Sequence, residues 1–157
     1  MFDALYRLVS GLDQPHRAAK QHDAAFALAV LLIEVARSAD NHVDDHAESL
    51  IERTLARRFG LERDEVRNLS KAAEEGAIQA ADLFHFTRVV VDQFSEEERI
   101  GVIEMLWEVA YSDGVLTGDE DTLIRRIAGL IYVPDWERGE AKRRVRERLE
   151  GKAPDQR

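Results

Sequence analysis

The chain has 157 residues, of which 45% are hydrophobic and 34% charged, the balance of a globular domain large enough to bury a core. It contains no cysteine, which excludes disulfides, thiolate zinc sites and cysteine nucleophiles, and its net charge of −9 argues against nucleic-acid binding. The longest apolar run, residues 24–33, is too short to span a bilayer, so the sequence predicts a protein that is not an integral membrane protein.

Hydrophobic residues recur at helical spacing along the whole chain, and no segment alternates with period two, so we expect an all-α fold of seven to eight helices. A short first helix from residue 2 should end at Gly11, Asp13 and Pro15. The next helix, 17–38, is apolar nearly all round and should be central to the core. Further helices are expected at 45–59, 62–75, 80–93, 96–111, 118–131 and 135–149.

Local signals mark several of these helix ends. Gly60 and Gly76 should each end a helix, because glycine readily adopts the left-handed conformation found there. Asp135 follows a proline and is a candidate cap of the last helix. Two capping boxes open helices, namely Ser95 with Glu98 and Thr117 with Glu120.

One helix–loop–helix segment occurs twice. LWEVAYSDGVLTGDED, residues 106–121, matches LIEVARSADNHVDDHAESLI, residues 32–51, at an offset of 74 before the loop and 73 after it. Gly114 should end the helix in a left-handed turn, and Asn41, the next best residue for that conformation, replaces it in the earlier copy. We therefore expect two hairpins that superimpose in a pseudo-two-fold arrangement.

Both loops are crowded with acids. Hard divalent cations need several oxygen ligands, which short acidic loops at helix N-termini can supply. The same acids could instead oppose the helix dipole in the first turn, which needs no ligand. A true EF-hand does not fit, because Val109 and Tyr111 occupy the positions of its first two acids. The acids are Asp40, Asp44, Asp45 and Glu48 in the first loop and Asp113, Asp119, Glu120 and Asp121 in the second.

Glu34 and Glu108 are equivalent carboxylates near the helix ends, beside buried faces, where a carboxylate needs a partner. Arg37 can pair with Glu34, and no residue equally close in sequence serves Glu108. A structural ion pair is the ordinary explanation. Their occurrence in both copies also suggests a shared acidic centre in which they approach Asp40 and Asp113.

Two histidines give a further metal hypothesis. His42 and His46 are four residues apart with acids between them, which on a helix would be a zinc pair. His42 should lie in the loop, however, and the second copy has Val115 and Asp119 instead. A metal-dependent hydrolase would combine one of these histidines with the acidic-loop residues in a pocket that keeps a coordination position free.

The C-terminal end differs in charge from the rest. Residues 138–157 contain eight basic and four acidic residues, a net charge of +4. Such a segment could bind an acidic partner or a lipid headgroup, or it could be a solvated helix face. A purely structural adaptor that docks through this helix or through the acidic face is therefore an alternative function.

Three segments resemble the TerB-like family, the family of tellurite resistance protein B, and in particular its small stand-alone bacterial branch. They are ADLFHFTRVV, the block from SEEERIGVIEM to IAGLIYV, and LLIEVARSADNHVDDHAE, within residues 22–148. The resemblance implies one cytoplasmic helical domain over 1–157, with a core at about 17–149 and a flexible tail at 150–157. It also implies a non-enzymatic interaction or metal-sensing module of a stress or metal response, with a protein partner or a membrane-associated complex.

The resemblance also bears on the acids, since clustered acidic residues of TerB-like domains have been suggested to bind metal ions. Carried over, these are Asp40 and Glu48 in the first copy and Asp113 and Glu120 in the second. The first loop departs from the pattern, because Asn41 replaces glycine and its spacing is one residue longer. Together with the repeat, this predicts a Mg²⁺, Ca²⁺ or Mn²⁺ site drawn from Glu34, Asp40, Asp44, Glu48, Glu108, Asp113 and Glu120.

Overall fold

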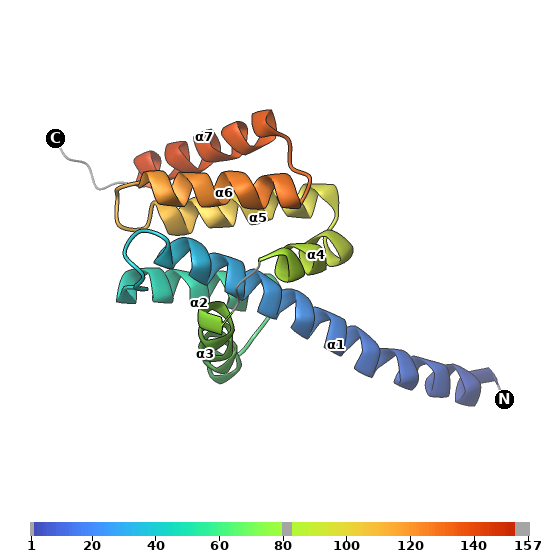
Figure 1. Ribbon diagram of the computed structural model, residues 1–157. Coiled ribbons are helices and arrows are strands. Elements are labelled where there is room, and N and C mark those ends of the chain that lie inside the picture. Colours follow the sequence, from blue (N-terminus) through green and yellow to red (C-terminus); the bar gives the residue numbers. More distant parts are fainter. Residues whose placement is uncertain (1, 80–82, 153–157) are drawn as a thin grey trace.

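The computed structural model describes residues 2–79 and 83–152 and confirms the all-α prediction (Figure 1). No strand occurs within these two ranges. Nor does any helix within them combine the length and hydropathy needed to cross a membrane. The helices are α1 (Phe2–Arg37), α2 (Asp45–Phe59), α3 (Arg63–Gln79), α4 (Phe84–Gln93), α5 (Glu96–Ala110), α6 (Gly118–Leu130) and α7 (Asp135–Lys152).

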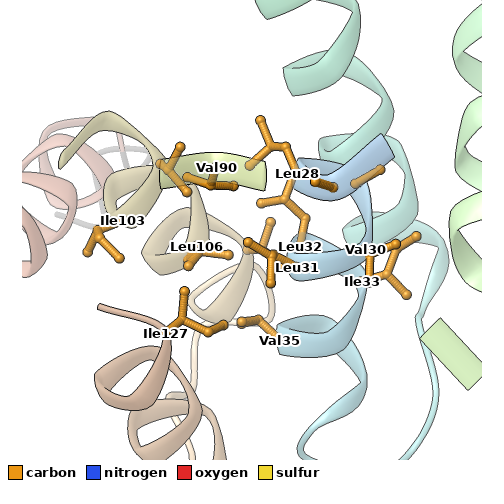
Figure 2. Packing of buried hydrophobic residues seen from close by; sticks show 14 of the residues in the cluster. Leu28, Val30, Leu31, Leu32, Ile33, Val35, Val90, Ile103, Leu106 and Ile127 are labelled. Carbon is orange, nitrogen blue, oxygen red and sulfur yellow. The ribbon is translucent and has the colours of Figure 1, made fainter. Parts of the chain in front are cut away.

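The apolar stretch of α1 is the centre of the core, as predicted. Leu28, Leu31 and Leu32 are fully buried on the side of α1 that faces α4, α5 and α6 (Figure 2). Val30 and Ile33 lie on the opposite side of α1, away from α4, α5 and α6. Because neighbours cover α1 on both sides, an apolar residue is favourable at nearly every position of this stretch.

The two predicted hairpins, α1–α2 and α5–α6, pack side by side on this core, and both of their loops lie at the same end of the molecule (Figure 1). One equivalent pair in the core has the same burial, because Leu32 in α1 and Leu106 in α5 are both 0% exposed. The chain turns in the left-handed conformation at Asn41, with φ 59°, and at Gly114, with φ 84°. Around the hairpins, α3 and α4 pack on α1, and α7 packs on α5 and α6.

The predicted break near Pro15 was wrong, because α1 continues unbroken from Phe2 to Arg37. Proline removes one helix hydrogen bond and clashes with the preceding turn, yet a helix can kink there and continue. The N-terminal part of α1 extends beyond all the other helices (Figure 1). A proline in the sequence thus imposes only a local free-energy cost on a helix, and the neighbouring helical turns can outweigh that cost.

The predicted end of a helix at Gly76 was also wrong. Helix α3 runs through Gly76 to Gln79. A Cβ atom added at Gly76 would lie 3.1 Å from Cζ of Phe26 on α1. This glycine therefore allows α3 to approach α1 closely, a packing role that its local sequence does not reveal.

The other helix ends follow the sequence signals more closely. Gly60 ends α2 in the left-handed conformation, with φ 65°, and both predicted capping boxes are formed. Asp135 is not the cap of α7, since it is already helical and the carbonyl of Pro134 accepts the hydrogen bond from the N–H of Arg138 at 3.0 Å. Helix α7 takes in residues 150–152 of the predicted tail, whereas 153–157, like 80–82 at the predicted start of α4, lie outside the described residues.

Candidate acidic loop site

The two acidic loops have the same internal hydrogen bond. In the α1–α2 loop, Oδ1 of Asp40 accepts from the N–H of His42 at 3.2 Å. In the α5–α6 loop, Oδ1 of Asp113 accepts from the N–H of Val115 at 3.0 Å. Each aspartate thus closes a turn around the left-handed residue that follows it, and the repeat seen in the sequence extends to loop geometry.

After the turns the two copies differ. Thr117 caps α6, and Oε1 of Glu120 accepts from the Thr117 N–H at 3.0 Å and from its hydroxyl at 3.0 Å. Asp44 caps α2 by accepting from the N–H of Ala47 at 2.8 Å. Counted from the caps, Ala47 holds the position of Glu120, whereas Glu48 is one position further and exposed. The buried carboxylate is therefore a feature of the second copy alone.

Glu120 is buried at the end of the molecule where the two loops lie, and only 4% of its surface is exposed. Burial raises the pKa of its carboxyl above the ordinary value, and the hydrogen bonds from Thr117 partly oppose this. The negative charges of Asp113 and Asp40 raise the pKa further. One carboxylate from each loop thus raises the pKa of the buried Glu120, whereas the shared acidic centre predicted from the repeat was to consist of Glu34, Glu108, Asp40 and Asp113.

Glu34 is paired as predicted. Its Oε1 lies 3.4 Å from Nη1 of Arg37, and Nη2 of the same arginine donates to Oδ1 of Asn41 at 2.7 Å. Burial raises the pKa of Glu34, and the positive charge of Arg37 opposes that shift. These residues and Asp40 line an open hollow at the end of α1.

Glu108, by contrast, belongs to an ion-pair network between α5 and α7. Nη2 of Arg148 lies 3.0 Å from Oε1 of Glu108 and 3.5 Å from Oε1 of Glu104. Nε of Arg144 lies 3.1 Å from the same Glu104 oxygen. No residue close in sequence can pair with Glu108, and its partner comes instead from the last helix. The negative charge of Glu108 is therefore paired with an arginine and does not join the loop carboxylates.

The remaining predicted ligands lie at the surface. His42, His46, Asp44, Asp45 and Glu48 are all exposed. Among the described side chains, no three His, Asp or Glu residues lie close enough together to hold one metal ion. A cation at this end would therefore have to draw the two loops together to gain its ligands.

Most of the basic side chains of the C-terminal helix form ion pairs within the molecule. Its cations pair with acids on α5, on α6 and on α7 itself. This arrangement matches the solvated helix face expected from sequence as the alternative to a docking surface. The paired cations are Arg138, Lys142, Arg143, Arg144 and Arg148.

Replacement of Glu120 by glutamine should change how stability depends on pH. The folded state binds a proton at Glu120 more tightly than the unfolded state does, because the pKa is raised above 4.5 on folding. Wild-type stability should therefore fall as the pH rises from 4.5 through the raised pKa. Glu120→Gln keeps an oxygen acceptor for Thr117 but cannot ionise, so it should lose this dependence.

Urea midpoints of the two proteins at a series of pH values between 4 and 8 test this expectation. The wild type should lose stability relative to the variant as the pH rises. Glu97→Gln, a change at an exposed first-turn acid of α5, is the matched control and should leave the profile unchanged. Parallel profiles for wild type and Glu120→Gln would contradict a raised pKa at Glu120.

Comparison with known proteins adds one match. The family model described as "Tellurite resistance protein TerB" matches residues 25–143 of the chain, which include α2 to α6, both acidic loops, and parts of α1 and α7. No curated protein matches the chain, and no solved structure matches it.

Proposed function

The chain belongs to the TerB family, and from this membership we propose that it is a non-enzymatic module of a cytoplasmic stress or metal response. In this proposal a divalent cation binds between the two acidic loops and thereby alters the surface offered to a protein partner. The family match supports the kind of domain, and the repulsion that Asp40 and Asp113 exert on the buried Glu120 carboxyl supports the cation.

The observation that carries the proposal is the effect of Asp40 and Asp113 on the buried Glu120. Carboxylates held near one another repel, and a cation placed among them would relieve the repulsion. The candidate ligands are all oxygen atoms, which favours Mg²⁺, Ca²⁺ or Mn²⁺ over softer metals. Asp44 and Glu48 are exposed near the α1–α2 loop and could complete the coordination sphere of the cation.

Binding at this place would couple the two hairpins. Asp40 follows α1 and Asp113 follows α5, so a cation that contacts both would fix one loop relative to the other. Both loops lie at one end of the molecule (Figure 1), so such a change would be confined to a single face. A partner that contacts both loops would then distinguish the loaded from the empty state.

The expected result is a higher melting temperature in millimolar Mg²⁺, Ca²⁺ or Mn²⁺ than in chelator. A ligand that binds only the folded state stabilises it by about 2.7 kcal/mol at a concentration 100 times its dissociation constant. Asp113→Asn should remove most of the gain. Asp64→Asn, at an exposed acid in the first turn of α3, should keep it. Thermal scans, with calorimetric titration of chelator-treated protein, provide the measurement.

Identical melting curves with cation and with chelator would reject the cation site. The acids would then be helix caps and first-turn charges, and the adaptor alternative would stand. The hydrolase alternative has less support, because His42 and His46 are exposed and neither lines the hollow beside Asp40.

A further inference from the structure

Helix α7 packs on α5 and α6 with a small apolar surface and specific ion pairs (Figure 1). Nε of Arg144 lies 3.1 Å from Oε1 of Glu104 on α5. Nζ of Lys142 lies 3.2 Å from Oδ1 of Asp121 on α6. The buried residues of α7 are Ala141 and Val145. The surface that α7 covers therefore selects a helix with small apolar residues and with cations at these two positions.

The connection that leads from α6 to α7 contains a strained residue. The N–H of Val133 donates to the carbonyl of Ala128 at 2.9 Å, and the N–H of Tyr132 donates to the carbonyl of Gly129 at 3.3 Å. These two bonds make a Schellman turn, in which the left-handed residue is usually glycine. Tyr132 occupies that position with φ 61°. A residue with a side chain pays a free-energy cost for this conformation.

The end of α2 forms a similar turn without that cost. The N–H of Leu61 donates to the carbonyl of Ala56 at 3.1 Å, and the left-handed residue is Gly60, with φ 65°. The ring of Tyr132 gives little packing in return, because 73% of the residue is exposed. Strain that is retained in a structure is often connected with a conformational role. The α6–α7 connection is therefore a candidate hinge.

Helix α7 also has contacts of its own that do not depend on its neighbours. Arg143 pairs with Glu140 at 2.6 Å and with Glu147 at 2.9 Å. Arg138 pairs with Asp135 at 2.9 Å. Pairs three or four positions apart stabilise a helix without any tertiary contact. Helix α7 can therefore change its position as a unit, and it is the last helix that the structure describes.

We propose that two copies of this chain swap α7, so that the α7 of each copy packs on α5 and α6 of the other. Residues 131–134 are the hinge. In this dimer Arg144 still pairs with Glu104, but across the two copies. The hinge opens into an extended connection, which releases Tyr132 from its left-handed conformation. Pro134 favours this form, because the residue before a proline prefers extended backbone.

A second copy is the partner that this surface fits, because its α7 carries the same residues as the helix that it replaces. No new surface is needed, and the contacts of α7 are the same in the single chain and in the dimer. The difference lies in the two hinges, whose strain is released together and opposes the loss of freedom on association. Short hinges under strain favour such swapping. The dimer is closed by a two-fold axis and leaves no α7 unpacked.

Sedimentation equilibrium of the full chain over a concentration series tests the proposal. It should show a species of twice the 17.9 kDa of one chain. Tyr132→Gly forms the closed turn without strain, so it should raise the dissociation constant of the dimer at least about tenfold. Tyr132→Ala is the matched control, since it removes the same ring but keeps a Cβ atom at the strained position. Its dissociation constant should stay close to that of the wild type.

Charge reversal distinguishes a swapped dimer from an ordinary one. Glu104→Arg and Arg144→Glu each oppose the packing of α7 on its own chain, because each places two like charges together. When the two variants are mixed, a swapped dimer restores one reversed pair and one original pair across the copies. The mixture should therefore contain more dimer than either variant alone. An ordinary dimer gains nothing from mixing, because each α7 stays on its own chain.

Glu140→Arg mixed with Arg143→Glu is the control for the mixing experiment. This ion pair lies within α7 and moves with it, so mixing should not increase the amount of dimer. Far-ultraviolet circular dichroism checks that the helices of each variant are formed. A monomeric wild type, a dimer that Tyr132→Gly leaves unchanged, or a mixture of the Glu104→Arg and Arg144→Glu variants without added dimer would each overturn the proposal.

Discussion

Replacing Trp107 with alanine should lower the free energy of unfolding by about 3–5 kcal/mol. Only 1% of this side chain is exposed on α5. The ammonium group of Lys142 lies 4.9 Å from the ring centroid, and the ring of Tyr111 lies 6.3 Å away. Truncation would therefore open a large cavity and remove a cation–π contact between α5 and α7. Urea unfolding followed by circular dichroism measures the loss.

The chain offers a matched control, because its other tryptophan, Trp136, is 67% exposed. Trp136→Ala should change stability by less than about 0.5 kcal/mol. Trp107→Phe should cost less than Trp107→Ala, since it keeps a ring and removes an Nε1 atom that has no hydrogen-bond partner among the described residues. A loss below about 1 kcal/mol for Trp107→Ala would show that the residue is not part of the core.

Leu32→Ala and Leu106→Ala should each cost about 2–5 kcal/mol, and the two losses should be similar. These leucines are equivalent in the repeat, and each is 0% exposed. Both point into the layer between α1 and α5 (Figure 2). Each truncation leaves a cavity in the same layer, so both variants should unfold at a lower urea concentration than the wild type.

Val115→Ala provides the comparison for these leucines, because Val115 belongs to the repeated segment but is 64% exposed. Its loss should be within about 0.5 kcal/mol of zero. A loss of several kcal/mol at one leucine and almost none at the other would contradict the pseudo-two-fold core and show that the hairpins are packed differently.

The features predicted correctly from the sequence are those determined over a few residues. The capping box of Thr117 and Glu120 joins groups three positions apart, so its pattern is visible in the chain. The left-handed turn at Gly114 likewise follows from local backbone preference. The apolar run 24–33 predicted a central helix, because a helix that is apolar nearly all round has to be covered on every side.

The errors and omissions arose where distant parts of the chain meet. Gly76 signals a helix end locally, but its role is set by Phe26, fifty residues earlier. The partner of Glu108 is Arg148, forty residues later. Burial of Glu120 was also not foreseen, although its capping-box position and the apolar residues after it were a usable signal. The order of residues does not reveal such pairings until the helices are placed in space.

We expect helix α7 to open locally without unfolding of the whole molecule. Ala141 and Val145 are its fully buried residues, and much of its remaining contact with α5 consists of exposed or half-exposed ion pairs. Such pairs contribute little and are weakened by salt. The backbone amide hydrogens of α7 should therefore exchange with solvent through local opening, whereas those in the buried part of α1 should exchange only through global unfolding. Each opening would withdraw Lys142 from Trp107, so this buried aromatic residue would meet solvent each time α7 opens.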